Sequence, residues 1–297
     1  MALNNQQDSE FDINKQWISK SFSKAANSYN SVAYLQKEVA NRLIERLDLV
    51  TMQPHTILDV GSGTGYCGKL IEQRYKSSHV YSLDIAHGML CYAKQNQGFF
   101  QKLRSNKQFI CGDAESLPIK NESMDMLVSS LAIQWLADLE KTFTQFRSVL
   151  KPGGLLMFSS MGPDTLKELR QAWAAVDDYV HVSAFFDMHD VGDALMRAGF
   201  SDPVMDVETI TLTYDSVDVL MSDLKALGSR NATKGRAKGL MGKNKIQQMK
   251  SAYEKFRQDN LLPATYEVVY GHAWVPENAV APSTLDNGFP IPVREKK

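Results

Sequence analysis

A glycine cluster between an apolar run and a helical stretch constrains the fold of this chain more than any other feature. Residues 57–68 read ILDVGSGTGYCG and overlap the apolar run 55–60. Glycines at such a point let the chain turn tightly and let a ligand approach the backbone before the helix begins. The sequence therefore predicts a strand, a turn and a helix over 55–75, with a ligand site at the turn.

The same alternation continues along the chain. Further strands are expected at 79–83, 107–111, 124–130, 155–160, 204–213 and 265–274. Helical spacing is present at 17–26, 33–47, 66–75, 89–97, 139–150, 164–176 and 188–198, and over most of 216–258. Residues 151–154, KPGG, are expected to end a helix before the fifth strand. Strands alternating with helices indicate an α/β fold with a parallel, Rossmann-like sheet.

Three acids lie at the ends of successive predicted strands and narrow the choice of ligand. They are Asp59, Asp84 and Asp113. Residues 63–68 also match GxGxxG, and Asp84 lies near the distance of a ribose-binding acid, so a dinucleotide site is the competing hypothesis. A carboxylate at position 59 would repel a pyrophosphate but suits a ligand that carries an ammonium and a sulfonium. This pattern favours S-adenosylmethionine, with the amides of 61–65 at its methionine portion.

Residues 30–160 resemble class I S-adenosylmethionine-dependent methyltransferases. The resemblance implies a mostly parallel seven-stranded sheet flanked by helices, with a helical lid after strand 5 and before the last strand. It implies that Asp84 holds the ribose hydroxyls, Asp113 the adenine amino group and Ala114 the ring, with Met89 on the adenine face. The cofactor-binding residues expected are Asp59, Gly61, Ser62, Gly63, Gly65, Asp84, Ile85, Met89, Asp113, Ala114, Ser130 and Leu131.

The flanking segments narrow the resemblance. Residues 11–43, 162–173, 185–214, 220–231 and 262–274 are similar to the malonyl-acyl-carrier-protein O-methyltransferases of biotin synthesis, so the likeness spans about 11–275. That family methylates the free carboxyl of a malonyl thioester, from acyl carrier protein or coenzyme A, and leaves S-adenosylhomocysteine. The malonyl carboxylate is already ionised at neutral pH, so we expect no general base. Rate should come from positioning and from exclusion of water.

A carboxylate substrate needs a cationic partner in a buried site. Between Asp223 and Glu254 the sequence has basic residues and no acid: Lys225, Arg230, Lys234, Arg236, Lys238, Lys243, Lys245 and Lys250. A solvated helix face accounts for most of them, but the run over 225–250 also suits docking of an acidic acyl carrier protein. Lys225 or Arg230, with Arg236 in reserve, is expected to reach the malonyl carboxylate. Tyr29 and Phe185 are further substrate-positioning candidates.

The bulk properties exclude several classes of protein. The net charge is −1, which gives no indication of nucleic-acid binding, and there is no apolar run long enough to span a bilayer. The three cysteines have no metal-like spacing, and Asp187 next to His189 is better interpreted as a helix cap than as a metal site. We therefore expect a cytoplasmic protein with no metal, nucleic-acid or membrane partner.

Four segments are expected. Residues 1–50 form helices over the cofactor site, and 51–160 form the Rossmann-like core. Residues 161–275 hold the remaining strands and the helical substrate lid, and 276–297 form a disordered tail. Alternatives stay open at this point: an arginine hydroxylase or assembly factor of the same superfamily, which resembles 164–170, 220–225 and 262–266; a basic binding module that keeps the cofactor as a structural ligand; and a dinucleotide oxidoreductase.

Overall fold

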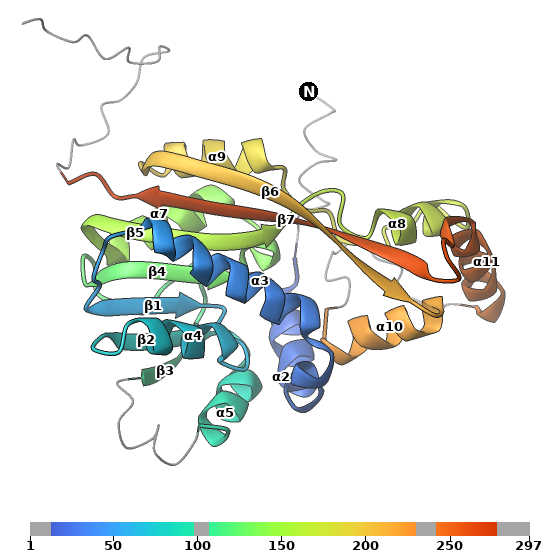
Figure 1. Cartoon of the computed structure of the whole chain (residues 1–297), viewed down its shortest axis with the longest axis horizontal. Coiled ribbons are helices and arrows are strands. Elements are labelled where there is room, and N and C mark those ends of the chain that lie inside the picture. The colour runs from blue at the N-terminus through green and yellow to red at the C-terminus, as the bar shows by residue number, and fades with distance from the viewer. Residues whose placement is uncertain (1–12, 98–106, 230–241, 278–297) are drawn as a thin grey trace, which may run out of the picture.

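The computed structural model describes residues 13–97, 107–229 and 242–277. Arg230, Arg236 and nearly all of the tail after Pro276 lie outside these residues. The seven strands form one sheet in the order β3-β2-β1-β4-β5-β7-β6 (Figure 1). They are β1 (Thr56–Val60), β2 (His79–Asp84), β3 (Lys107–Cys111), β4 (Met124–Ser130), β5 (Leu150–Met161), β6 (Ser201–Tyr214) and β7 (Leu262–Trp274).

The sheet is parallel except at β7. Strand β7 pairs antiparallel with both β5 and β6, while β1 to β5 pair parallel with their neighbours. The expected seven-stranded, mostly parallel Rossmann-like sheet is confirmed. The chain leaves β1 toward β2 and β3 and then returns to place β4 on the other side of β1. This reversal leaves a crevice at the carboxyl ends of β1 and β4, where open α/β sheets bind ligands.

Helices cover both faces and the carboxyl-end edge of the sheet. They are α2 (Lys15–Val32), α3 (Tyr34–Glu45), α4 (Tyr66–Arg74), α5 (His87–Gln95), α7 (Leu139–Val149), α8 (Lys167–Ala174), α9 (Met188–Arg197), α10 (Val217–Ala226) and α11 (Lys243–Tyr253), with short 3₁₀ turns η1 (Arg46–Leu49), η2 (Ile133–Trp135) and η3 (Glu254–Phe256). Polar side chains begin several of them. Asn14 and Asp138 accept hydrogen bonds from Trp17 N and Lys141 N at 2.9 Å, and Asp187 accepts one from His189 N at 2.8 Å. The expected cap at Asp187 is thus present.

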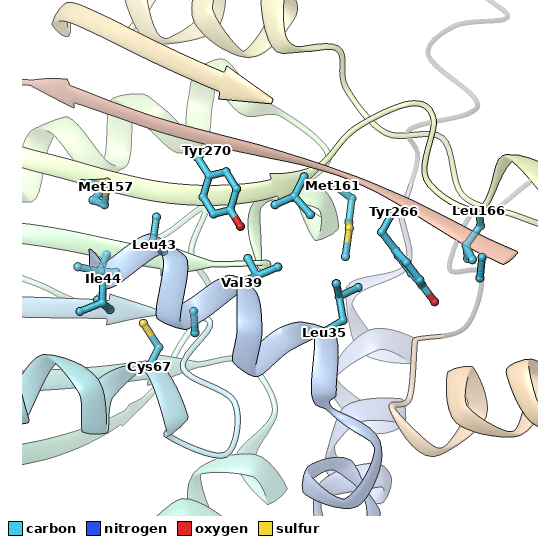
Figure 2. Packing of buried hydrophobic residues seen from close by; sticks show 14 of the residues in the cluster. Leu35, Val39, Leu43, Ile44, Cys67, Met157, Met161, Leu166, Tyr266 and Tyr270 are labelled. Carbon is cyan, nitrogen blue, oxygen red and sulfur yellow. The ribbon is translucent and has the colours of Figure 1, made fainter. Parts of the chain in front are cut away.

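Two apolar clusters lie on opposite faces of the sheet. On one face, α3 points Leu35, Val39 and Leu43 at Met161 of β5 and Tyr270 of β7 (Figure 2). On the other face, Phe143 and Phe146 of α7 pack against Phe158 and its neighbours. The first cluster continues past Met161 to Tyr266 and Leu166, which also line the large cavity described below (Figure 2). The core therefore provides part of the wall of the site.

Helix α7 ends at Val149, directly before the KPGG segment, as expected, but the fifth strand begins earlier than residue 155. Residues 151–154 lie within β5, which begins at Leu150. The pairing of β4 with β5 changes register from Met124↔Leu150 to Met126↔Leu155, so the segment forms a bulge. Gly153 N donates to Val275 O at 2.9 Å, and Val275 N donates to Gly154 O at 2.9 Å. These bonds to the end of β7 keep the segment in the sheet.

Strands β6 and β7 form a long ribbon that extends beyond the parallel part of the sheet. Helices α10 and α11 lie at its far end, and α10 lies beside α2 (Figure 1). Two serines of α2 fix this contact: Ser21 Oγ donates to Gly228 O at 3.0 Å and Ser28 Oγ to Ala226 O at 2.9 Å. No helix among the described residues combines the length and the apolar character of a membrane span.

Candidate active site

Three adjoining cavities lie at the carboxyl ends of β1, β2 and β4. The strand-end cavity, of about 110 Å³, is lined by Asp84, Asp113 and the end of β4. The glycine-turn cavity, of about 50 Å³, lies between α3 and the turn that contains Gly61 and Gly63. The large cavity, of about 510 Å³, extends from α2 to α8 and α10. Tyr29 of α2 lines all three, so it lies where they meet.

Most of the expected cofactor residues line the two smaller cavities. The strand-end cavity is lined by Gly61, Gly63, Asp84, Ile85, Met89, Asp113, Ala114, Ser130 and Leu131. Ser62 lines the glycine-turn cavity together with Gly61, Gly63 and Ser130. Asp59 and Gly65 line neither cavity. Because no ligand is present, the role of each residue stays a prediction.

The backbone amides of the glycine turn are already hydrogen-bonded within the protein. Gly61 N and Ser62 N both donate to Leu83 O, at 2.8 and 3.0 Å, and Gly65 N donates to Ser62 O at 2.9 Å. Gly63 N donates to Asp84 Oδ2 at 2.8 Å. These four amides already have partners within the protein, and their contact with a ligand stays a prediction. Three of them bond to Leu83 and Asp84 of β2, so they are less available to a pyrophosphate.

Asp84 is the carboxylate at the centre of this arrangement. It is 8% exposed, and its second oxygen, Oδ1, accepts from Ala86 N at 2.7 Å. Burial raises the pKa of Asp84, although the amides of Ala86 and Gly63 favour its charged form. A buried carboxylate beside a cavity is costly unless a ligand hydroxyl or cation compensates it, so Asp84 suits a polar, uncharged or cationic ligand group.

Asp59 is buried beneath the start of α4 and has a different environment. It is 1% exposed, and its Oδ2 has no hydrogen-bond partner among the described residues. Burial raises the pKa of Asp59 to about 7, against the opposing effects of the Lys107 ammonium and the Gly68 amide. Asp59 therefore lies behind the turn and lines none of the three cavities.

The raised pKa of Asp59 predicts a pH-dependent stability. The folded state holds the Asp59 proton more tightly than the unfolded chain, whose aspartates titrate near 3.8. This contribution favours folding at low pH and is lost as the pH rises toward 7. In urea titrations, the free energy of unfolding of Asp59→Asn should gain on wild type by about 2 kcal/mol between pH 5 and pH 7. A difference that stays constant over this range would contradict the assignment.

Asp113 is held by a lysine that the sequence analysis did not single out. Lys15 Nζ at the start of α2 lies 2.7 Å from Asp113 Oδ2 and 2.8 Å from Glu115 Oε2. Partial burial disfavours the charged lysine, but the two carboxylates raise its pKa overall. Lys15 also lines the strand-end cavity. The ion pair fastens α2 over this cavity and leaves Asp113 at its edge, 34% exposed in its side chain.

Four residues separate the strand-end cavity from the large cavity. Phe22, Tyr29, Leu131 and Trp135 line both. Phe22 and Trp135 pack edge to face, with ring centroids 5.4 Å apart. Leu131 has the left-handed φ of +50°, and its amide donates to Ser159 O and to Ser159 Oγ at 3.0 and 3.1 Å. Such a backbone is strained for leucine, and strain of this kind is typical of functional sites.

Tyr29 completes this boundary. Burial and the nearby Asp84 carboxylate raise the pKa of its hydroxyl well above the usual range, so the hydroxyl stays protonated. The expectation that Tyr29 lies at the cofactor or the substrate thus has a geometric basis, because the side chain borders every cavity of the site.

The large cavity is mostly apolar, with a few polar groups. Phe185 and Lys225, two of the expected substrate residues, line it. A further group was missed from the sequence. The His181 ring stacks on Trp173 with centroids 3.9 Å apart, and His181 Nε2 lies 2.6 Å from Asp177 Oδ1. Asp177 also pairs with Lys245 at 2.8 Å, and these two contacts lower its pKa to about 2.

Several buried oxygen atoms at the cavities have no hydrogen-bond partner among the described residues. Gln36 Oε1, between the large and glycine-turn cavities, has no hydrogen-bond partner among the described residues, and the same holds for Ser62 Oγ. Gln134 donates from Nε2 to Leu131 O at 2.8 Å, and its Oε1 has no partner within that part of the chain. Buried polar atoms normally have partners, so a ligand with donor groups fits here. Within the described ranges there is no cluster of three or more His, Cys, Asp or Glu that could hold a metal.

Comparison with known proteins places the chain in a family. A model of the methyltransferase domain matches residues 58–158, which run from β1 to β5. A malonyl-acyl-carrier-protein O-methyltransferase of Gallionella capsiferriformans is 51% identical over 269 residues, which cover 90% of this chain and 93% of the relative. An enzyme of the same name from Laribacter hongkongensis is 50% identical, and the match covers 95% and 96% of the two chains. The chain belongs to the malonyl-acyl-carrier-protein O-methyltransferase family.

Solved structures agree on the fold. The YcgJ protein of Bacillus subtilis superposes with a TM-score of 0.56 at 16% identity and covers 81% of this chain and 99% of its own. A putative methyltransferase of Bacillus halodurans gives 0.56 at 17% identity, covering 80% and 98%. At this level of identity the likeness extends to the fold alone, and it confirms a methyltransferase-type Rossmann-like fold.

Proposed function

We propose that this protein transfers a methyl group from S-adenosylmethionine to the free carboxylate of malonyl-acyl carrier protein, giving the methyl ester. The observation that supports this most is the meeting of two unlike cavities at one boundary. An acid-lined cavity at the strand ends and a large apolar cavity share Phe22, Tyr29, Leu131 and Trp135. A donor and an acceptor bound on either side of that boundary would bring their reacting groups together.

The residues present fit S-adenosylmethionine better than a dinucleotide. Asp84 and Asp113 stand at neighbouring strand ends, as the ribose hydroxyls and the adenine amino group require. In the glycine-turn cavity, Gln36 Oε1 offers an acceptor to an ammonium, and Lys37, whose Nζ donates to Asn30 O at 2.8 Å, provides a cation on the same lining. The glycine amides that a pyrophosphate would need are bonded to Leu83 and Asp84.

The protein's part in the reaction is to bind, to orient and to exclude water. When bound, S-adenosylmethionine supplies a methyl group activated by the sulfonium charge. The malonyl carboxylate needs no base because it is ionised at neutral pH. Phe22, Tyr29 and Trp135 close the boundary against water, which would otherwise solvate the attacking oxygen.

The malonyl thioester belongs in the large cavity. Its volume of about 510 Å³ and apolar walls suit an acyl chain on a pantetheine arm. Lys225 and His181 line the cavity and can hold one carboxylate oxygen while the other stays free to attack. The position of Arg230 and Arg236 relative to the cavity stays a prediction. Masking this carboxylate would let later enzymes with apolar pockets accept the chain, in keeping with a role in biotin synthesis.

A direct assay tests the function. Purified protein, S-adenosylmethionine and malonyl-acyl carrier protein should give a carrier protein heavier by one methyl group, with one S-adenosylhomocysteine formed for each ester. Acetyl-acyl carrier protein is the matched control because it lacks the free carboxyl, and it should give no product. Methylation of both carrier proteins, or of neither, would refute the proposed acceptor.

A further inference from the structure

A basic groove lies between α2 and α10, outside the three cavities of the site. Its volume is about 660 Å³, and its lysines are Lys20 and Lys24 from α2 and Lys225 from α10. Lys20 and Lys24 are one helical turn apart, so they lie on the same face of α2. Serines 21, 28 and 222 add further polar groups, and none of the described residues that line the groove is an acid.

The three lysines are exposed and uncompensated. None of them has an ion pair or a side-chain hydrogen bond to another residue in the parts of the chain that the structure describes. By contrast, Lys15, Lys151 and Lys167 each pair with an acid. Three like charges around one groove repel each other, and this repulsion is relieved when an anion binds there.

The groove also differs from the segment 225–250, where the sequence analysis placed the docking surface, because lysines of that segment are paired with acids. Lys245 pairs with Asp177 at 2.8 Å, and Lys250 pairs with Asp218 at 2.6 Å. Two of the basic residues in that run are therefore neutralised within the fold. Lys225 instead joins two lysines that lie about 200 residues earlier in the sequence, which no inspection of the run itself could indicate.

Hydrogen bonds and a close contact between α2 and the end of α10 fix the shape of the groove. The end of α10 is tied to α2 by Ser21 and Ser28, whose hydroxyls donate to Gly228 O and Ala226 O. Gly228 has a φ of +74°, and a Cβ there would lie 3.0 Å from Ala25 Cβ and 3.2 Å from Ser21 O. Glycine thus permits the close contact between the two helices, and the contact fixes the spacing of the lysines on either side.

Lys225 connects the groove to the site, because it lines both the groove and the large cavity. A ligand whose anionic end lies in the groove can therefore extend its other end into the apolar cavity. A carrier-bound malonyl group has this form: an acidic protein, a phosphodiester, a long neutral arm and the acyl group at its tip.

We propose that the α2–α10 groove is the docking surface for an acidic acyl carrier protein, and that Lys20 and Lys24 of α2 bind the phosphodiester and the acidic residues next to it. This inference rests on the proposed function, since it assumes a carrier-bound substrate. It assigns carrier recognition mainly to α2 and leaves acyl recognition to the large cavity.

The test is a double variant, Lys20→Gln/Lys24→Gln, which removes two charges and preserves helical side chains of similar length. The matched control is Lys69→Gln/Lys76→Gln, which changes one exposed lysine in α4 and one just after it; neither has a partner in the described ranges. We measure the Kd for malonyl-acyl carrier protein by fluorescence anisotropy, and kcat/KM for malonyl-acyl carrier protein and for malonyl-pantetheine, which has no phosphate and no protein.

The groove variant should bind malonyl-acyl carrier protein about tenfold more weakly, and its affinity should depend less on salt than that of wild type. Its kcat/KM for malonyl-pantetheine should match that of wild type, and the control variant should match wild type throughout. A Kd within twofold of wild type, an equal loss in the control, or no measurable binding by wild type would overturn the proposal. Wild type that binds the carrier but forms no ester would refute the proposed function and leave the groove result valid.

Discussion

Replacement of Asp84 by asparagine should weaken the binding of S-adenosylhomocysteine about 100-fold, as measured by calorimetry. The carboxylate borders the strand-end cavity and is 8% exposed, so hydrogen bonds from ligand hydroxyls to it would be charge-assisted and poorly screened. Asparagine keeps one acceptor oxygen where aspartate offers two. Asp84 already uses both oxygens for Gly63 N and Ala86 N, so the asparagine amide must also face one of these donors. The loss therefore combines a missing ligand contact with a shifted turn.

The variant Asp125→Asn distinguishes the loss of a ligand contact from the loss of carboxylate bonds to the backbone. Asp125 also ties backbone amides with its carboxylate, accepting from His55 N and Thr56 N at 2.8 Å, but it lies at the opposite end of the sheet. It should lower the free energy of unfolding and leave the affinity for S-adenosylhomocysteine within twofold of wild type. If Asp84→Asn bound S-adenosylhomocysteine as tightly as Asp125→Asn does, Asp84 would not contact the ligand.

The sequence predicted those parts of the fold that local patterns determine. Short apolar runs bounded by turn residues identified all seven strands, and glycines 61, 63 and 65 located the turn between β1 and α4. The errors are in features that depend on distant partners. Helix α7 does end before KPGG, yet the fifth strand was expected only from residue 155 and begins at Leu150, because Gly153 and Gly154 bond to Val275 just after β7. The sequence also could not show that the amides of Gly61 and Ser62 donate to Leu83 O of β2.

The residues of the candidate site also divide into those that local patterns indicate and those that only packing brings together. Acids at strand ends could be found because the Rossmann-like topology places the carboxyl ends of parallel strands on one edge. Lys15, Gln36 and His181 could not be found in this way. Helices over the cofactor site were expected within 1–50, but the side chains that they present to it depend on packing. Helix α2 covers the strand-end cavity, α3 lies beside the glycine turn, and the segment after α8 runs along the large cavity. Only the packing of these elements brings the side chains together.

Gly61→Ala should destabilise the protein by about 3 kcal/mol or more. A Cβ at position 61 would lie 2.2 Å from the Cβ of Ala132, a distance that no adjustment of a side chain can relieve because Ala132 has no rotatable atoms beyond Cβ. The backbone at Gly61 also has a left-handed φ of +72°. To accommodate the methyl group, either the turn or the segment after β4 must move. That segment carries Leu131, so the boundary between the cavities would shift as well.

Gly63→Ala distinguishes the steric cause from the conformational one. Gly63 has a left-handed φ of +52°, but a Cβ there would meet nothing within 4 Å. Urea unfolding should therefore show a loss of about 1 kcal/mol for Gly63→Ala, the cost of the backbone alone, against at least three times that loss for Gly61→Ala. If the two variants were equally stable, the contact between Gly61 and Ala132 would not limit the turn. A larger loss for Gly61→Ala than for Gly63→Ala would mean that only a glycine fits between the turn after β1 and Ala132 after β4. This close approach brings Leu131, the neighbour of Ala132, to the edge of both cavities.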